Sequence, residues 1–255
     1  MPRVKLTLAY DGGPFMGWQR QDHGPSVQAV LEAALARYCG VPVATQAAGR
    51  TDAGVHALGQ VAHADITRPD PPCKVQDALN ALMRPHPVAV LAVEPVSDSF
   101  SARFDAIGRA YLYRILNRRA PPTLERGQVW HIARPLDVPA MAEAAALLVG
   151  RHDFTSFRAV QCQARSPVRT LDLLTVEREG EEVRLRAEAR SFLHHQVRNM
   201  VGTLVQVGLG RWRVADVAAA LAARDRAAAG PTAPPQGLCL VRVDYPSAPR
   251  EPVSP

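Results

Sequence analysis

The first candidate for chemistry in this sequence is an aspartate between two glycines. Asp52 lies in the segment from Gly49 to Gly54 (GRTDAG), which separates two runs with the alternation of strands. Glycines permit a tight, exposed turn in which the backbone can approach a ligand closely. An aspartate in such a turn is usually only a solvated turn former. A chemical role for Asp52 therefore requires a partner elsewhere in the chain.

An arginine in a later amphipathic segment is the candidate partner. Arg198 lies in a segment whose apolar residues have helical spacing: Val197, Met200, Val201, Leu204 and Val205. Most helical arginines reach solvent, but a guanidinium turned into the protein needs a carboxylate, because an unpaired buried charge is strongly unfavourable. A pair with Asp52 would favour the ionised carboxylate that a nucleophile or base must be. We therefore predict that Arg198 pairs with Asp52.

The histidines raise the alternative of a metal site. His56 and His63 follow Asp52 closely, and His194 and His195 are adjacent. No two histidines have the spacing of one helix face, neighbouring side chains are expected to point apart, and no thiolate pair completes a tetrahedral site. The sequence therefore predicts no metal ligands and no metal-dependent chemistry.

Composition restricts the class of protein. The 255 residues are 47% hydrophobic and 21% charged, as in a folded globular chain, and the net charge of +6 favours a polyanionic partner. Nearly all the cations are arginines, although a GC-rich coding sequence would produce the same bias. No apolar leader or membrane-spanning run is present, and the four cysteines are scattered, so we expect a cytoplasmic protein with reduced thiols.

The hydrophobic periodicity of the first half predicts alternating strands and helices. Ser26 can cap a helix that Gly40 ends. The predicted elements are strand 4–10, helix 27–38, strands 43–48 and 60–66, helix 74–83 and strand 88–96. The order βαββαβ is that of a ferredoxin-like (RRM-like) fold, also used by modules that bind single-stranded RNA.

The second half repeats this theme less regularly. Its predicted elements are strand 109–117, helix 138–149, a hairpin of 170–178 with 183–190, helices 192–207 and 214–223, and strand 238–245. We expect an α+β protein in which two ferredoxin-like halves, 1–105 and 106–255, join into one extended, mostly antiparallel sheet with a central cleft. A Pro-rich tail, 246–255, ends the chain.

Several motifs, in one order along nearly the whole chain, resemble the family of tRNA pseudouridine synthase A. They are the GRTDAGVHA segment 49–57, Tyr10-Asp11-Gly12 with Phe15 and Gly17-Trp18-Gln19, Ala102-Arg103-Phe104, the strand with Tyr111, His152-Asp153-Phe154, and 192–202. Gly13 stands where the family usually has threonine, and the tail after Tyr245 has no counterpart in the family. Neither difference affects the proposed chemistry.

The resemblance implies an isomerase that converts uridine to pseudouridine at positions 38, 39 and 40 of the tRNA anticodon arm. It implies that Asp52 is the essential aspartate and that Arg198 pairs with it. Tyr111, which by itself reads as a half-buried strand aromatic, would stack on the target uracil, and Arg50 would help to fill the space left by the flipped base. The family also implies a homodimer that binds tRNA and needs no small-molecule cofactor.

Two other functions compete with this interpretation. A non-catalytic tRNA-binding protein could use the same stacking surface, but a carboxylate there would repel phosphates. A metal-dependent nuclease lacks a complete ligand set. Asp52 itself has three possible roles in the isomerisation, namely attack on C1′, addition to C6, or removal of the C2′ proton, and the sequence does not choose among them.

Overall fold

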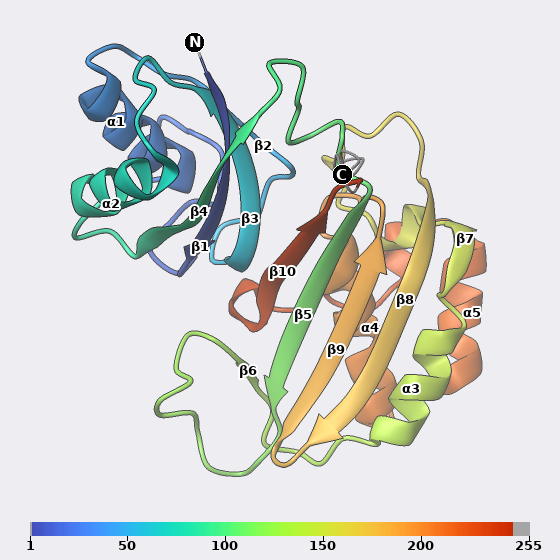
Figure 1. Ribbon diagram of the computed structural model, residues 1–255. Coiled ribbons are helices and arrows are strands. Elements are labelled where there is room, and N and C mark those ends of the chain that lie inside the picture. Colours follow the sequence, from blue (N-terminus) through green and yellow to red (C-terminus); the bar gives the residue numbers. More distant parts are fainter. Residues whose placement is uncertain (1, 247–255) are drawn as a thin grey trace, which may run out of the picture.

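The computed structural model describes residues 2–246, and the predicted Pro-rich tail lies, apart from Pro246, outside these residues. One large, mostly antiparallel sheet of ten strands runs through the molecule (Figure 1). Helices α1 (Val27–Cys39) and α2 (Pro72–Leu82) lie at one end of this sheet, and three further helices lie at the other. Among the described residues, no helix is both long and apolar enough to cross a membrane.

The elements of the first half follow the predicted order. They are β1 (Arg3–Tyr10), α1, β2 (Thr45–Ala47), β3 (His56–Asp65), α2 and β4 (Val88–Val96). α1 begins as predicted, because the Ser26 hydroxyl accepts a hydrogen bond from the Ala29 amide, and it ends at Gly40 in the left-handed conformation. β3 begins four residues before the predicted start at Gln60, because His56 and Ala57 pair with a strand from the far end of the chain.

The second half contains more short elements than the sequence predicts. They are β5 (Gly108–Leu116), β6 (Trp130–His131), α3 (Val138–Ala146), β7 (Gly150–Asp153), η1 (Thr155–Phe157), β8 (Val168–Glu179), β9 (Glu182–Ala189), α4 (Gln196–Gly208), α5 (Val214–Ala223), η2 (Arg226–Ala228), η3 (Pro235–Gly237) and β10 (Leu238–Asp244). β6 and β7 were not predicted, and α3 ends three residues early. The predicted start of α4 at Phe192 is wrong, because His195 has a left-handed φ of 62° that no right-handed helix contains.

Strand β10 connects the two groups of strands into one sheet. The strand order is β4-β1-β3-β10-β5-β9-β8-β7, with β2 paired to β3 and β6 to β5. β10 runs antiparallel to β5 and parallel to β3, where Cys239 lies opposite His56. A segment from the end of the chain thus fixes the first half against the second.

Two hydrophobic cores lie along this sheet. The first is built by β1, β3 and β4 with α1 and α2, and it includes Leu240 of β10. The second is built by β5, β8 and β9 with α3, α4 and α5, and it includes Leu238 of β10. Tyr111 on β5 packs against both cores, so its ring lies where they meet.

One buried histidine makes the fold sensitive to acid. His63 on β3 is 9% exposed, and its Nδ1 accepts a hydrogen bond from the Ala102 amide at 3.1 Å. Burial lowers the pKa of His63 from 6.5, with Arg3 acting in the same direction and Asp65 and Asp105 opposing. As the pH falls below about 6.5, His63 therefore takes up a proton in the unfolded chain but not in the folded chain. The folded state loses stability as a result.

We predict that His63→Asn reduces the loss of stability in acid, because the Asn oxygen can replace Nδ1 as acceptor but takes up no proton. Between pH 7.5 and 5.5, the wild-type free energy of unfolding should fall by roughly 1 kcal/mol more than that of the variant. Urea unfolding at both pH values measures this difference. Equal losses in the two proteins would show that His63 does not contribute to the pH dependence.

Candidate active site

The loop between β2 and β3 holds Asp52 in a closed turn. The Val55 amide donates to the Asp52 carbonyl at 3.1 Å, and Gly54 has a φ of 77° that glycine readily adopts. The neighbouring Thr51 side chain is buried, with its hydroxyl 2.8 Å from that of Tyr10. The backbone of the loop is thus fixed, while the Asp52 side chain stays 22% exposed.

A second glycine-rich loop, between β1 and α1, packs against this turn. The Trp18 amide donates to the Thr51 carbonyl at 3.1 Å, and the Gly54 amide donates to the Phe15 carbonyl at 3.3 Å. Gly17 has a φ of 97°, and a Cβ atom there would lie 2.5 Å from the Thr51 carbonyl oxygen. Glycine at this position therefore allows the two loops to pack backbone against backbone.

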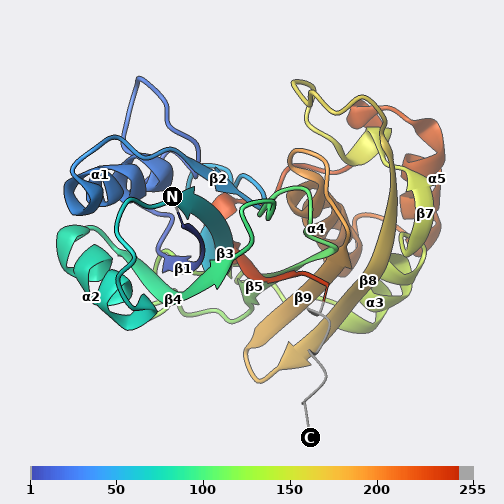
Figure 2. The ribbon, with the colours of Figure 1, turned by 45° about the horizontal axis from the view of Figure 1, so that its top comes forward.

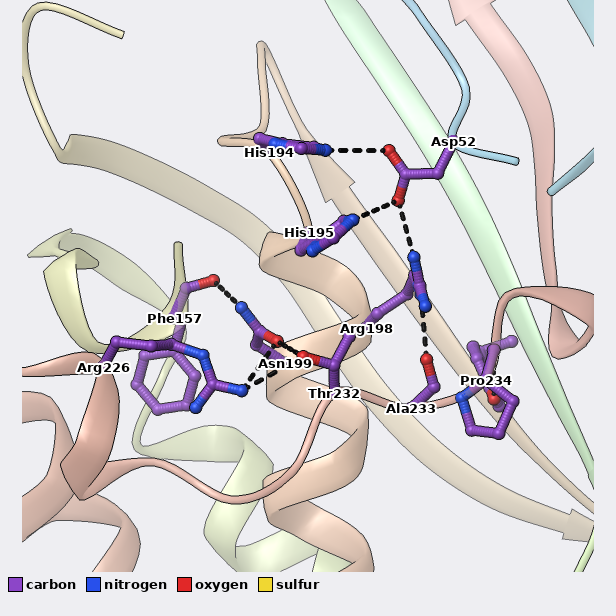
Figure 3. Close-up of polar contacts among 11 residues, drawn as sticks. Asp52, Phe157, His194, His195, Arg198, Asn199, Arg226, Thr232, Ala233 and Pro234 are labelled. Carbon is purple, nitrogen blue, oxygen red and sulfur yellow. Dashed lines mark hydrogen bonds and ion pairs between the residues drawn. The ribbon is translucent and has the colours of Figure 1, made fainter. Parts of the chain in front are cut away.

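Arg198 of α4 reaches Asp52 across the molecule. Its Nη1 lies 2.9 Å from Asp52 Oδ2, and its Nε donates to the Ala233 carbonyl at 2.8 Å (Figure 3). The Ala233 amide in turn donates to the Arg198 carbonyl at 3.0 Å. The structure thus brings together the two residues that the sequence analysis paired, and it adds a backbone loop that aims the guanidinium.

The two adjacent histidines also face Asp52, so the expectation that they point apart is wrong. His194 Nε2 lies 3.4 Å from Asp52 Oδ1, and His195 Nε2 lies 3.3 Å from Oδ2 (Figure 3). The two rings are 4.0 Å apart between centroids. Neighbouring side chains diverge in regular backbone, but the left-handed φ of His195 turns its ring to the side of His194.

The charge state of this cluster favours acid–base chemistry over metal binding. Burial lowers the pKa of His195, although the charge of Asp52 opposes the shift, so this imidazole is neutral near pH 7 and can accept a proton. Asp52, His194 and His195 offer ligand atoms within 4.8 Å of one another and could hold a metal ion. Arg198, however, occupies the same Asp52 oxygen that faces His195, and its charge would repel a bound cation.

A buried asparagine holds the loop that aims Arg198. Asn199 is fully buried; its amide nitrogen donates to the Phe157 carbonyl at 2.8 Å, and its oxygen accepts from Thr232 at 2.7 Å and from Arg226 at 3.2 Å (Figure 3). Thr232 directly precedes Ala233. The sequence analysis missed Asn199, because Phe157 and Thr232 lie 42 and 33 residues away from it along the chain.

Among the described residues, the Tyr111 side chain makes an aromatic contact but no hydrogen bond. It packs edge-on against Phe192, with 5.3 Å between ring centroids and 86° between planes. Within residues 2–246, its hydroxyl has no hydrogen-bond partner. Burial raises the pKa of Tyr111 well above its ordinary value, with Tyr10 and Asp52 adding to the shift, so the hydroxyl is protonated at neutral pH. The ring is placed for apolar contact and the hydroxyl is free to donate.

Arg50 is exposed beside this cluster. It lies two residues before Asp52 in the same loop. Among the described residues, its side chain takes part in no ion pair or hydrogen bond. Its charge is thus available to a ligand.

Arg109 on β5 ties the loops around the site to one another, which the sequence analysis also missed. Its terminal nitrogens donate to backbone carbonyls of four residues: Ala106 at 3.1 Å, Arg190 at 2.6 Å, Ala48 at 2.7 Å and Arg103 at 3.1 Å. Ala48 starts the Asp52 loop, and Arg190 starts the segment that carries Phe192 and the histidines. One guanidinium therefore fixes both segments relative to Tyr111, two residues further along β5.

A carboxylate held by a guanidinium, with imidazoles and a tyrosine beside it, defines the site of an enzyme that uses nucleophilic or acid–base catalysis. The basic chain that surrounds it favours a polyanionic substrate. The chain belongs to the tRNA pseudouridine synthase family, because a sequence model of that family matches residues 7–105 and 144–246.

Curated relatives cover nearly the whole chain. It is 64% identical to tRNA pseudouridine synthase A of Rhodospirillum centenum over 245 residues, which are 96% of this chain and 100% of that protein. It is 61% identical to the protein of the same name from Afipia carboxidovorans, with the same coverage. It is 60% identical to that of Paramagnetospirillum magneticum, over 96% of each chain.

We predict that Gly17→Ala displaces the Asp52 loop and lowers the free energy of unfolding by at least about 2 kcal/mol, because the new methyl group would meet the Thr51 carbonyl oxygen and the φ of 97° is strained for alanine. Urea unfolding measures the loss. Gly210→Ala is the matched control, since Gly210 has a φ of 68° with no atom within 4 Å of the added Cβ. The control should lose only about 1 kcal/mol. Equal losses would mean that the two loops do not pack as described.

Proposed function

We propose that this chain isomerises uridine to pseudouridine in tRNA, with Asp52 as the essential carboxylate. Membership of the tRNA pseudouridine synthase family carries this proposal, since the matched segments include both Asp52 and Arg198. The site supports it, because Asp52 is ion-paired to Arg198 and still partly exposed to a ligand. By resemblance, the targets are uridines 38, 39 and 40 of the anticodon arm.

The reaction balances within the substrate. The bond from N1 to C1′ of the target nucleotide breaks, the uracil turns, C5 bonds to C1′, the C5 proton is lost and N1 gains a proton. Attack on C1′, addition to C6 and removal of the C2′ proton all require an ionised Asp52, whose Oδ2 lies 2.9 Å from Arg198 Nη1. The neutral imidazole of His195 is placed to exchange a proton with Asp52. No metal takes part.

Access to the target uridine requires that it leave the helical stack. Unstacking costs a few kcal/mol, which contacts with the flipped base offset. Tyr111 supplies an apolar ring next to Asp52, and Arg50 supplies a free cation in the same loop. We infer that Tyr111 stacks on the uracil and that Arg50 occupies part of the vacated space.

We also propose an arrangement for the chain as a whole. The halves 1–105 and 106–255 are each ferredoxin-like and leave a cleft between them. The order β4-β1-β3, with β2 on the edge of β3 opposite β1, and the two separate hydrophobic cores support this division. We further infer a cytoplasmic homodimer in which one tRNA contacts both subunits, because tRNA is large beside a chain of 27.6 kDa.

We predict that Asp52→Asn lowers pseudouridine formation by more than about 100-fold while tRNA affinity stays within several-fold, because binding rests on many phosphate and stacking contacts. Mass spectrometry of nuclease fragments measures the product, and filter binding measures affinity. Asp77→Asn on α2 is the matched control, since this exposed carboxylate forms no ion pair among residues 2–246, and its activity should equal that of wild type.

Substantial product from Asp52→Asn would remove this residue from the chemistry. Retained tRNA binding with no product from the wild-type protein would support a non-catalytic binding protein. EDTA should leave the wild-type rate unchanged. A rate that falls with chelator and returns with a divalent ion, while the tRNA stays folded, would instead support a metal on Asp52 and the two histidines.

We predict that the ring and the hydroxyl of Tyr111 have separable roles. Tyr111→Phe should bind tRNA nearly as wild type does, because the ring remains, whereas Tyr111→Ala should lose about 1 to 3 kcal/mol of binding free energy. Filter binding at several tRNA concentrations measures both. A single-turnover rate for Tyr111→Phe then shows whether the hydroxyl takes part in proton transfer. Wild-type affinity in Tyr111→Ala would mean that the ring does not stack on a base.

A further inference from the structure

An exposed aromatic side chain lies in the turn between β4 and β5, outside the cluster around Asp52. Phe104 is 70% exposed, and the guanidinium carbon of Arg103 lies 5.5 Å from the centre of its ring. A single exposed phenylalanine needs no explanation by itself. Phe104 is significant because the turn that carries it is rigid and lies close to the Asp52 loop.

The backbone of the turn is fixed at several points. The Ala102 amide donates to His63 Nδ1 at 3.1 Å, and the Ala102 carbonyl accepts from the Tyr245 hydroxyl at 2.7 Å. The Phe104 amide donates to the Ser101 hydroxyl at 3.3 Å, and Ala102 is fully buried. The ring of Phe104 is therefore presented to solvent on a rigid support, as a preorganised contact would be.

This support lies next to the Asp52 loop. A single nitrogen of Arg109, Nη2, donates both to the Ala48 carbonyl and to the Arg103 carbonyl. Asp52 follows Ala48 by four residues, which span at most about 14 Å. The connection between β4 and β5 runs between the two groups of strands (Figure 2).

The charge of the turn suits a nucleic acid. Within residues 2–246, no ion pair or side-chain hydrogen bond occupies Arg103. The carboxylate of the adjacent Asp105 accepts from the Ser101 amide at 2.8 Å. A ring for stacking and a free guanidinium for phosphate are the two contacts by which proteins hold single-stranded nucleotides.

We propose that Phe104 is a stacking platform for a base that flanks the target uridine, with Arg103 bound to the adjoining phosphate. This inference rests on the proposed function and adds a second base contact, separate from that of Tyr111. A flanking base held on Phe104 would keep the strand open while the target nucleotide enters the site.

The test compares two substitutions that differ in aromaticity. Phe104→Tyr keeps a ring and should retain the wild-type KM for tRNA, whereas Phe104→Leu keeps only apolar bulk and should raise KM by about 5- to 100-fold. At saturating tRNA, kcat of both should stay within about two-fold of wild type. Leu91→Ala on β4, at a residue 49% exposed, is the control for loss of an exposed apolar side chain and should change neither constant.

A fluorescent base locates the contact. Anticodon stem-loop RNA with 2-aminopurine on either side of the target should be quenched by the wild type at one of the two positions, and not by Phe104→Leu. Arg103→Met should reduce the slope of log affinity against log salt by roughly one phosphate contact.

Equal KM values for Phe104→Leu and wild type would overturn this inference and leave the proposed function intact. The inference would also be overturned if Phe104→Leu sedimented as a monomer, unlike a dimeric wild type, and quenched 2-aminopurine as the wild type does. Phe104 would then belong to a subunit contact. A wild-type protein that forms no pseudouridine would instead reject the proposed function itself.

Discussion

The ion pair between Asp52 and Arg198 is the interaction on which the arrangement of this molecule depends. Each charge is largely removed from water, so each requires the other, yet they belong to segments 146 residues apart. Three features join the segments on either side of this pair, whose charged atoms lie 2.9 Å apart. β10 pairs with strands on both sides, Arg109 links the Asp52 loop to the histidine segment, and the loop at Ala233 aims the guanidinium.

The backbone around the site is fixed, while the Asp52 side chain stays partly exposed to a ligand. Preorganised catalysis requires both. Thr51 and Asn199 are buried and hydrogen-bonded. Their role is to leave Asp52 and Arg198 a single relative position. The Asp52 carboxylate is thus held in one orientation beside the Arg198 guanidinium.

Local signals in the sequence are sufficient for some parts of this structure and not for others. α1 could be predicted to within one residue, because Ser26 and Gly40 determine its ends locally. The pair of Asp52 and Arg198 could be predicted because an inward-facing guanidinium requires a carboxylate, and Asp52 in its glycine-flanked turn was the candidate. The start of β3 depends on β10, far along the chain, and the short strands β6 and β7 form only by pairing with the nearby strands β5 and β8. The backbone reversal at His195, which turns two histidines onto Asp52, has no pattern in residue type that would reveal it.

The position of β10 also determines when this protein can become active during its synthesis. Most of the first core comes from residues 1–105, but Leu240 of β10 completes it, and until β10 is made His56 and Ala57 of β3 lack the strand that pairs with them. At 5 to 20 residues per second, on the order of 10 s passes between translation of β3 and of β10. During that interval an open strand edge is available to other chains. Translation of β10 closes this edge, and a chain that stalls before Leu238 leaves it open.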